Sequence, residues 1–432
     1  MSATAPVVRD ESPVSESLRH VTVTSKKFPT VFTVMTVVLG LIVLLAPREG
    51  ETKFRFAADT DFFAIPSVAV PAMPLAWVCL AILVVLTVLS WVLFLQERRT
   101  PWALGVLFGL AFLAGFLGWG GAGSVSDFPV VRLVSSSVLL AVPILFGALG
   151  GAIGERAGVV NIAIEGQLLG SAFVAAVVGS ITKNPWAGLL AALLAGALVA
   201  LVLGVFTITY RVNQVIVGVV LNVLVLGLTT FLFTQVLVPN TSQLNQTVRF
   251  PAIRIPVLSE IPIIGPALFR QSIIVYLMYL AVPLVWFALY RTRWGLRLRA
   301  VGEHPLAADT VGIKVERVRY RAVLVAGAIV GFGGAYYTLV AVSQFNRNMT
   351  AGAGFIALAA VIFGKWDPVR AAMAALLFGF ASALEGAMSV VGSPVPSQFM
   401  LMLPYVVTLF AVAGLVGRSR APAASGVAYV KE

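Results

Sequence analysis

The chain carries little charge, one cysteine and two histidines. Only 11% of its 432 residues are charged, whereas a soluble domain carries about 25%. Cys79 lies inside an apolar run, so neither a disulfide framework nor a cysteine metal cluster is expected. His20 and His304 show no recognisable metal-ligand spacing. These shortages exclude a soluble globular protein and a disulfide-rich one, and we expect no metal site.

Long apolar runs take the place of charge. Hydrophobic residues make up 59% of the chain, and many runs reach about 20 residues, the length that crosses a bilayer as a helix. The fold class expected is therefore an all-α polytopic membrane protein with about 10–12 transmembrane helices. The apolar spans are Thr30–Ala46, Leu75–Leu95, Trp102–Gly118, Val134–Ile153, Leu168–Ile181, Trp186–Ile208, Val215–Val238, Ile273–Tyr290, Ala322–Val342, Gly354–Phe363, Val369–Val391 and Phe399–Val416.

The net charge of +12 has two readings, nucleic-acid binding and membrane orientation. No basic patch interleaved with aromatics supports nucleic acid. Most Lys and Arg instead fall on alternate connections, which predicts that those connections and both termini are cytoplasmic. The predicted divisions are a disordered cytoplasmic tail (1–28), an additional transmembrane pair (29–100), a core (101–416) and a disordered cytoplasmic tail (417–432).

An internal repeat links the two halves of the core. Gly150-Gly-Ala recurs as Gly333-Gly-Ala, and Pro185 recurs at the same spacing as Pro368. An odd number of crossings separates the two units, so they have opposite orientation. Inverted repeats are typical of transporters, with the substrate path where the repeats meet. A channel would need a filter or a charged ring, and none is evident. The small residues themselves favour close helix packing over lining of a pore.

The most highly charged connection between apolar spans runs from Arg291 to Arg321. In its middle Pro305 suits the first turn of a helix, and Gly312 suits the residue that ends one. The apolar residues of this short helix would form a smooth face that a soluble partner could bind. They are Leu306, Ala307, Ala308 and Val311.

A few polar residues stand out within or beside the spans. Glu385 lies inside a span, where a carboxylate faces a cavity or partner unless it reaches water at the interface. Glu165 either caps the helix that it begins or belongs to the translocation route. Asn222 either bonds a neighbouring helix or faces the substrate path. No second intramembrane acid or histidine lies at helical spacing, which argues against a proton-coupled carrier.

No catalytic chemistry is evident. Gly364-Lys365 resembles the end of a phosphate loop, but Ala359 and Trp366 break the G-x-x-x-x-G-K-[ST] pattern. We therefore expect a non-enzymatic chain without a cofactor, in which ATP and Mg²⁺ would be bound by a partner ATPase.

Four stretches together resemble bacterial ABC-importer permeases of the branched-chain amino acid, ribose and nucleoside group, and the first and third are most similar to the nucleoside-uptake branch. They span roughly residues 135–415. The four are Gly154-Glu-Arg-Ala-Gly-Val-Val-Asn-Ile-Ala-Ile-Glu-Gly166, Asn213-Gln-Val-Ile-Val-Gly-Val-Val-Leu-Asn222, Gly354-Phe-Ile-Ala-Leu-Ala-Ala-Val-Ile-Phe-Gly364 and Ala300-Val-Gly-Glu-His-Pro-Leu-Ala-Ala-Asp-Thr-Val-Gly-Ile313.

The resemblance implies an ATPase subunit with two nucleotide-binding domains, a second related permease and a lipid-anchored nucleoside-binding protein. It implies alternating access driven by the ATPase. The residues expected to couple to the ATPase are Glu303, His304, Pro305, Leu306, Ala307, Ala308, Val311 and Gly312. The candidates for the substrate path are Asn161, Glu165, Gln167, Asn222, Phe355 and Glu385.

Three alternatives stay open at this point. The same class includes permeases for ribose and other simple sugars. A secondary carrier would work alone on an ion gradient. A scaffold or receptor would transport nothing. An ATPase encoded beside this chain would count against the last two.

Overall fold

The computed structural model describes residues 26–57, 65–392, 395–396, 398–399, 402 and 420–431. Within that part, ten helices are long and apolar enough to cross a membrane. The predicted all-α membrane fold is therefore confirmed. The last predicted span, Phe399–Val416, lies almost wholly outside the described residues.

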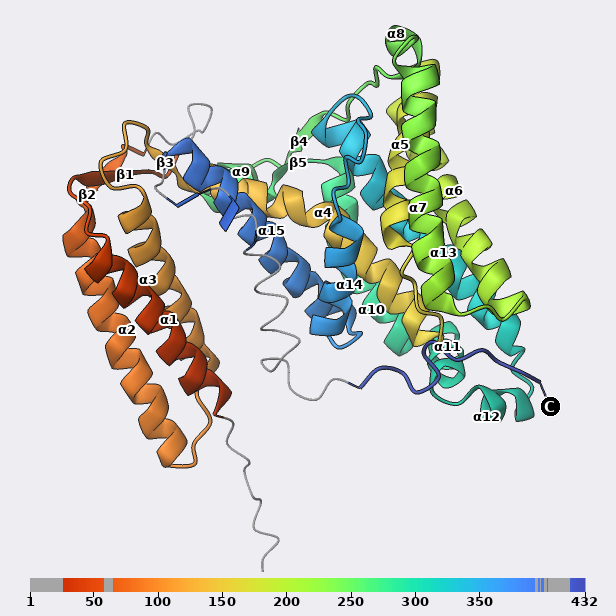
Figure 1. The fold of residues 1–432 in the computed structure, drawn as a ribbon, viewed down its shortest axis with the longest axis horizontal. Coiled ribbons are helices and arrows are strands. Elements are labelled where there is room, and N and C mark those ends of the chain that lie inside the picture. Colours follow the sequence, from red (N-terminus) through yellow and green to blue (C-terminus); the bar gives the residue numbers. More distant parts are fainter. Residues whose placement is uncertain are drawn as a thin grey trace, which may run out of the picture. The chain divides into compact units, whose positions relative to one another are not determined.

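The first three helices form a compact unit of their own (Figure 1). They are α1 (Lys27–Leu45), α2 (Ala72–Leu95) and α3 (Trp102–Gly120). The rings of Phe32 and Phe108 stack with centroids 3.9 Å apart, and the hydroxyls of Thr36 and Thr87 lie 2.9 Å apart. The third span was predicted to belong to the core (101–416), but in the structure α3 packs with α1 and α2.

The connection between α1 and α2, expected only as an outer loop, contains strand structure. Strand β1 (Glu51–Arg55) pairs antiparallel with β2 (Val68–Pro71) and parallel with β3 (Phe128–Pro129). The resulting sheet order is β2-β1-β3. The strands satisfy backbone groups of a segment whose mixed charges keep it out of a bilayer.

The second unit contains the remaining described helices. Its first half comprises α4 (Val130–Arg156), α5 (Ile164–Thr182), α6 (Pro185–Gly204) continued by the π-helical segment η1 (Val205–Thr209), and α7 (Gln214–Leu232) continued by the π-helical segment η2 (Phe233–Leu237). Its second half comprises α10 (Ile273–Arg291), α11 (Arg293–Glu303), α12 (Pro305–Thr310), α13 (Val315–Tyr336) continued by the π-helical segment η4 (Tyr337–Ala341), α14 (Ala353–Phe363) and α15 (Pro368–Val390). Between the halves, a proline-rich connection holds α8 (Thr241–Leu244), β4 (Ala252–Arg254), η3 (Leu258–Glu260), α9 (Ile264–Leu268) and β5 (Arg270–Ser272).

The predicted inverted repeat is visible where α4 crosses α13. A Cβ added to Gly150 would lie 2.6 Å from Val330 Cγ2 and 2.8 Å from the Ala326 carbonyl oxygen. A Cβ added to Gly333 would lie 3.2 Å from the Cα of Pro143. Moving forward along α4 moves backward along α13, so the helices are antiparallel. The same shift along the sequence relates Gly150 to Gly333 and Pro143 to Ala326. The contact between Gly150 and Ala326 is therefore equivalent to the contact between Gly333 and Pro143, as a two-fold axis requires.

The two halves are also intertwined. Helix α4 of the first half packs along α15 of the second half, and α13 of the second half packs along α6 of the first half (Figure 1). The two partner helices begin alike, with a proline in the first turn. Asn184 Oδ1 accepts from Trp186 N at 2.9 Å, and Asp367 Oδ1 accepts from Val369 N at 3.1 Å. The repeat is thus both a sequence pattern and a packing pattern.

The charged connection between α10 and α13 is mostly helical, where the sequence indicated a loop with one short helix. Thr292 caps the start of helix α11, because its hydroxyl accepts from Gly295 N at 3.1 Å. Its charged residues are spread between apolar positions, of which Leu298 and Val301 are buried. This amphipathic pattern makes α11 a surface helix rather than a membrane span. The short helix α12 follows it as predicted.

Candidate functional site

The first candidate site is the turn between α4 and α5 and the residues that hold it. Gly158 adopts a φ of +88°, which allows the chain to reverse after α4. Beyond it, Val160 N donates to Gln214 Oε1 at 2.6 Å. The amides of Asn161 and Gln167 exchange two hydrogen bonds, of 3.0 and 3.2 Å, and both are buried. Two predicted path residues therefore satisfy each other inside the fold.

Asn222 of α7 secures the same turn from outside. Its Oδ1 accepts from Gly166 N at 2.8 Å, and its Nδ2 donates to the Ile162 carbonyl oxygen at 2.9 Å. The first contact meets one of the N–H groups that have no partner within α5, because they lie in its first turn. Asn222 thus bonds a neighbouring helix, which is the packing role weighed for it from the sequence.

Glu165 caps a helix other than its own, so the first of its two sequence interpretations, a cap on α5, is replaced by a cap on α14. Its Oε1 accepts from Thr350 Oγ1 at 2.6 Å and from Gly352 N at 2.9 Å, and its Oε2 accepts from Gly354 N at 2.6 Å. These groups begin α14, the short helix of the second repeat. A carboxylate at a helix N-terminus meets both the free donors and the positive end of the helix dipole.

The structure gathers some predicted path residues and leaves one apart. Asn161, Glu165, Gln167 and Asn222 all surround the start of α5. Phe355 follows the capped turn on α14, and its ring is 50% exposed. Glu385 is half-buried on α15, and among the described residues it has no hydrogen-bond partner. The gathered residues form one polar centre where α5 and α14 meet; Glu385 is not among them.

A second polar junction lies where α4 ends, and the sequence reading did not single out its residues. The buried Glu155 carboxylate accepts a short hydrogen bond from the Trp366 indole N–H. Arg156 donates to the Trp366 carbonyl oxygen at 3.2 Å and to Tyr290 Oη at 3.2 Å. In the sequence, the only indication of this junction is the adjacent pair of charges Glu155-Arg156 beside an apolar span. The junction ties the ends of α4 and α10 to the turn between α14 and α15.

The second candidate site is the segment expected to meet an ATPase. His304 caps the start of helix α12, because its Nδ1 accepts from Ala307 N at 3.2 Å, and Pro305 is the first residue of the helix. Gly312 follows it with a φ of +83°, as the sequence predicted. The predicted apolar face divides in two, however. Ala308 packs inward against Val301, whereas the others are exposed: Leu306, Ala307 and Val311.

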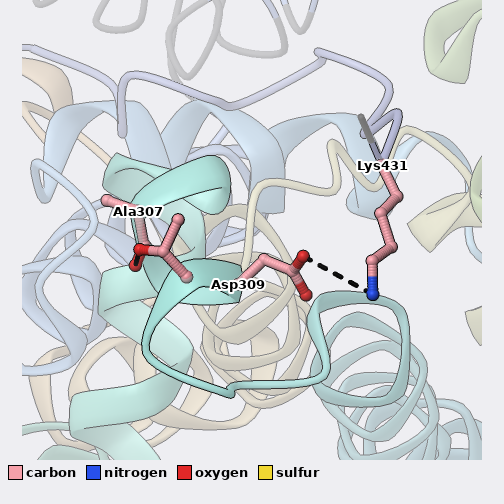
Figure 2. A network of polar contacts seen from close by, with 4 residues as sticks. Ala307, Asp309 and Lys431 are labelled. Carbon is pink, nitrogen blue, oxygen red and sulfur yellow. Dashed lines mark hydrogen bonds and ion pairs between the residues drawn. The ribbon is translucent and has the colours of Figure 1, made fainter.

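The end of the chain lies on this segment, although the sequence predicted a disordered tail. Residues 420–431 run along α11 to α12 (Figure 1). Tyr429 is buried in the same cluster as Ala308, and its burial, together with Asp309, raises the pKa of its hydroxyl. Lys431 Nζ lies 3.8 Å from Asp309 Oδ2. Figure 2 shows the Asp309 carboxylate of α12 turned toward Lys431.

Comparisons with known proteins agree with one another. The chain is 40% identical over 309 residues to the guanosine ABC transporter permease protein NupQ of Bacillus subtilis, which covers 69% of this chain and 96% of the relative. It is 38% identical over 314 residues to the nucleoside ABC transporter permease protein NupC of Lactococcus lactis, again covering 69% and 96%. It is 39% identical over 258 residues to a putative glucose ABC transporter permease protein of Haloferax volcanii, covering 59% and 76%.

No solved structure matches the chain significantly. The model of one protein family, described as the branched-chain amino acid transport system / permease component, matches residues 133–412. That range holds more than half of the chain and contains both repeats, the polar centre at α5 and α14, and helix α12. The chain therefore belongs to the branched-chain amino acid transport system permease family, as a multi-pass membrane protein.

Proposed function

We propose that this chain is a permease subunit of an ATP-driven importer of nucleosides, with purine nucleosides as its main substrates. The observation that carries the proposal is the extent of the likeness. Two relatives whose names specify guanosine or nucleosides align over 96% of their length. Two relatives with glucose in their names align over 76% and 74% of their length. Simple-sugar uptake is therefore the second candidate.

The transport cycle proposed here is alternating access. A partner ATPase docks on α12 and on neighbouring parts of the charged segment, and ATP binding moves these segments. The intertwined repeats then rock about their two-fold relation, so that a path near the membrane midplane opens first outward and then inward. A lipid-anchored binding protein delivers the nucleoside from outside, and a second permease completes the path. Both termini lie in the cytoplasm.

The polar centre has a structural part in this mechanism. Both oxygens of Glu165 are engaged by α14, and Asn161, Gln167 and Asn222 are engaged around α5. These groups hold the starts of α5 and of the short helix α14 in place. Direct contact with the flat base falls to Phe355, whose exposed aromatic ring follows the capped turn and suits stacking.

The test is purification of the chain with its natural partners, followed by uptake into vesicles. We expect an ATPase and a second permease to co-purify, and ATP hydrolysis to rise with guanosine and the binding protein but not with glucose. Stimulation by glucose alone would transfer the assignment to sugar uptake. Solute movement by the purified chain alone, driven by an ion gradient, would overturn the proposal in favour of a secondary carrier.

A further inference from the structure

The C-terminal segment 420–431, named here the strap, contacts both repeats. On the first repeat, Gly426 N donates to the Gly158 carbonyl oxygen at 3.3 Å. On the charged segment that leads into the second repeat, Ala424 N donates to the Gly302 carbonyl oxygen at 2.9 Å. The strap therefore bridges the turn that begins α5 and the end of α11.

A buried arginine fixes the middle of the strap. Arg319 of α13 is 1% exposed, and its Nη1 donates to the Val427 carbonyl oxygen at 2.9 Å. Its Nε and Nη2 are buried and have no hydrogen-bond partner within the described part of the chain. A charged group buried with so few partners is costly, so the strap carbonyl is its main compensation. Loss of the strap would open this guanidinium to water.

The end of the strap holds α12 from its inner side. The Tyr429 ring joins a cluster with Val301 of α11, Ala308 of α12 and Val315 of α13. Ala308 is the only residue of α12 that is buried. The inward face of α12 therefore rests on a side chain of the strap, and the salt bridge between Lys431 and Asp309 adds a second attachment.

The path from the strap to the polar centre is short. Gly158, which accepts from the strap, also accepts from Gln214 Nε2 at 3.4 Å. Gln214 in turn accepts from Val160 N, next to Asn161. A displacement of the strap would therefore reach the turn whose residues begin α5. The strap itself lies beyond residues 133–412, the part that the family model matches.

We propose that the strap is a positioning element that links helix α12 to the α4–α5 turn, so that movement of α12 by the ATPase is transmitted to the first repeat. This inference rests on the proposed function. It assigns Arg319 and Tyr429 as positioning residues that hold the strap at its middle and its end. Neither touches the substrate.

The test compares wild-type complex, a chain lacking residues 420–432, Tyr429→Ala and Tyr429→Phe, each purified with its partners. The Tyr429→Phe variant keeps the aromatic ring and should therefore retain its packing on α12. We expect nucleoside imported per ATP hydrolysed, measured with radiolabelled guanosine, to fall about fivefold or more in the truncated and alanine variants. The phenylalanine variant should stay near wild type, as should the matched control Val430→Thr, which alters an exposed strap residue.

The outcomes separate two failures. Wild-type complex that imports no guanosine would refute the proposed function. Wild-type import with an unchanged guanosine-to-ATP ratio in Tyr429→Ala would refute the strap proposal, even if thermal stability fell. If the truncated chain fails to accumulate, Tyr429→Ala and Arg319→Met decide the matter. A reduced guanosine-to-ATP ratio in both variants, at wild-type ATPase binding, supports the link, and an unchanged ratio in either variant refutes it.

Discussion

Glu165 shows how one side chain can join the two repeats. It starts α5 yet satisfies three donors at the start of α14. We expect Glu165→Ala to lower the free energy of unfolding by about 1–3 kcal/mol or more, since buried donors lose their acceptor. We also expect guanosine uptake to be lost. Thermal unfolding of the purified complex and vesicle uptake measure the two effects.

The length of the Glu165 side chain matters as well as its charge. Glu165→Asp keeps the charge but withdraws it by one methylene, so it should also lose most uptake. The matched control is Glu260→Gln in the exposed η3 turn, which should change neither measurement. Full uptake by Glu165→Ala would contradict the role given to this cap.

Asn222 offers a second test at the scale of single residues. Asn222→Leu would fit the apolar helix around it but leave Gly166 N and the Ile162 carbonyl oxygen without their partner. We expect the free energy of unfolding to fall by about 1–3 kcal/mol, because these buried groups lose their hydrogen bonds. Thermal unfolding should show it, whereas the neighbouring Val223→Ala, on the exposed side of α7, should show little. Equal stability of the two variants would be inconsistent with this account.

The sequence identified these polar residues but not their partners. A carboxylate or amide in an apolar chain is visible without a structure, because burial of such a group needs compensation. The partner of Glu165 at Thr350 is 185 residues away, however, and only tertiary packing brings it near. The same holds for Glu155 and Trp366, 211 residues apart. The local sequence pattern therefore identifies candidate polar residues, whereas their roles depend on partners that only the tertiary fold brings close.

At the scale of the element, α12 presents one face to solvent and one to the strap. Leu306 and Val311 are 42% and 75% exposed, so they are the residues available to a docking ATPase. We expect Leu306→Asp and Val311→Asp to weaken co-purification of the ATPase about tenfold or more, as loss of an apolar anchor does. The permease itself should stay stable, because neither side chain supports its core.

Ala308→Leu is the matched contrast. It adds volume to the buried face of α12 beside Tyr429, so it should lower the melting temperature of the permease itself, a typical cost being about 1–3 kcal/mol. Unaltered ATPase binding in both aspartate variants would remove α12 from the docking surface.

Some elements follow from the sequence and others do not. The limits of α12, α6 and α15 are marked by proline at their starts or glycine at an end, because these residues act on the backbone directly. Helix α11 was missed since its charges resemble those of a loop. The strap was missed because its small residues, with a proline and a glycine, predict neither a helix nor a strand. Its order depends instead on contacts with distant helices, through Arg319 of α13 and the ring of Tyr429.

For the whole molecule, the two-fold relation makes a paired prediction. Gly150 and Gly333 hold equivalent places at the crossing of α4 and α13. We expect Gly150→Val and Gly333→Val to destabilise the permease to similar extents, by about 1–3 kcal/mol or more from overpacking. Thermal unfolding of the two variants, side by side, measures this.

The matched control is Gly227→Ala on α7, where an added Cβ would meet nothing within 4 Å. It should be neutral or slightly stabilising, because alanine favours a helix over glycine. A large loss for only one of the two valine variants would mean that the repeats are not equivalent in packing.

The intertwining of the halves also bears on how the protein is made. Helix α4 emerges from the ribosome long before α15, its packing partner, and α6 likewise precedes α13. During synthesis the first repeat therefore sits in the bilayer with its glycine-rich contact faces open, and the native core closes only when the second repeat has been inserted. Premature termination anywhere before α15 would leave a membrane-embedded chain without its core, a natural substrate for membrane proteases and insertion chaperones.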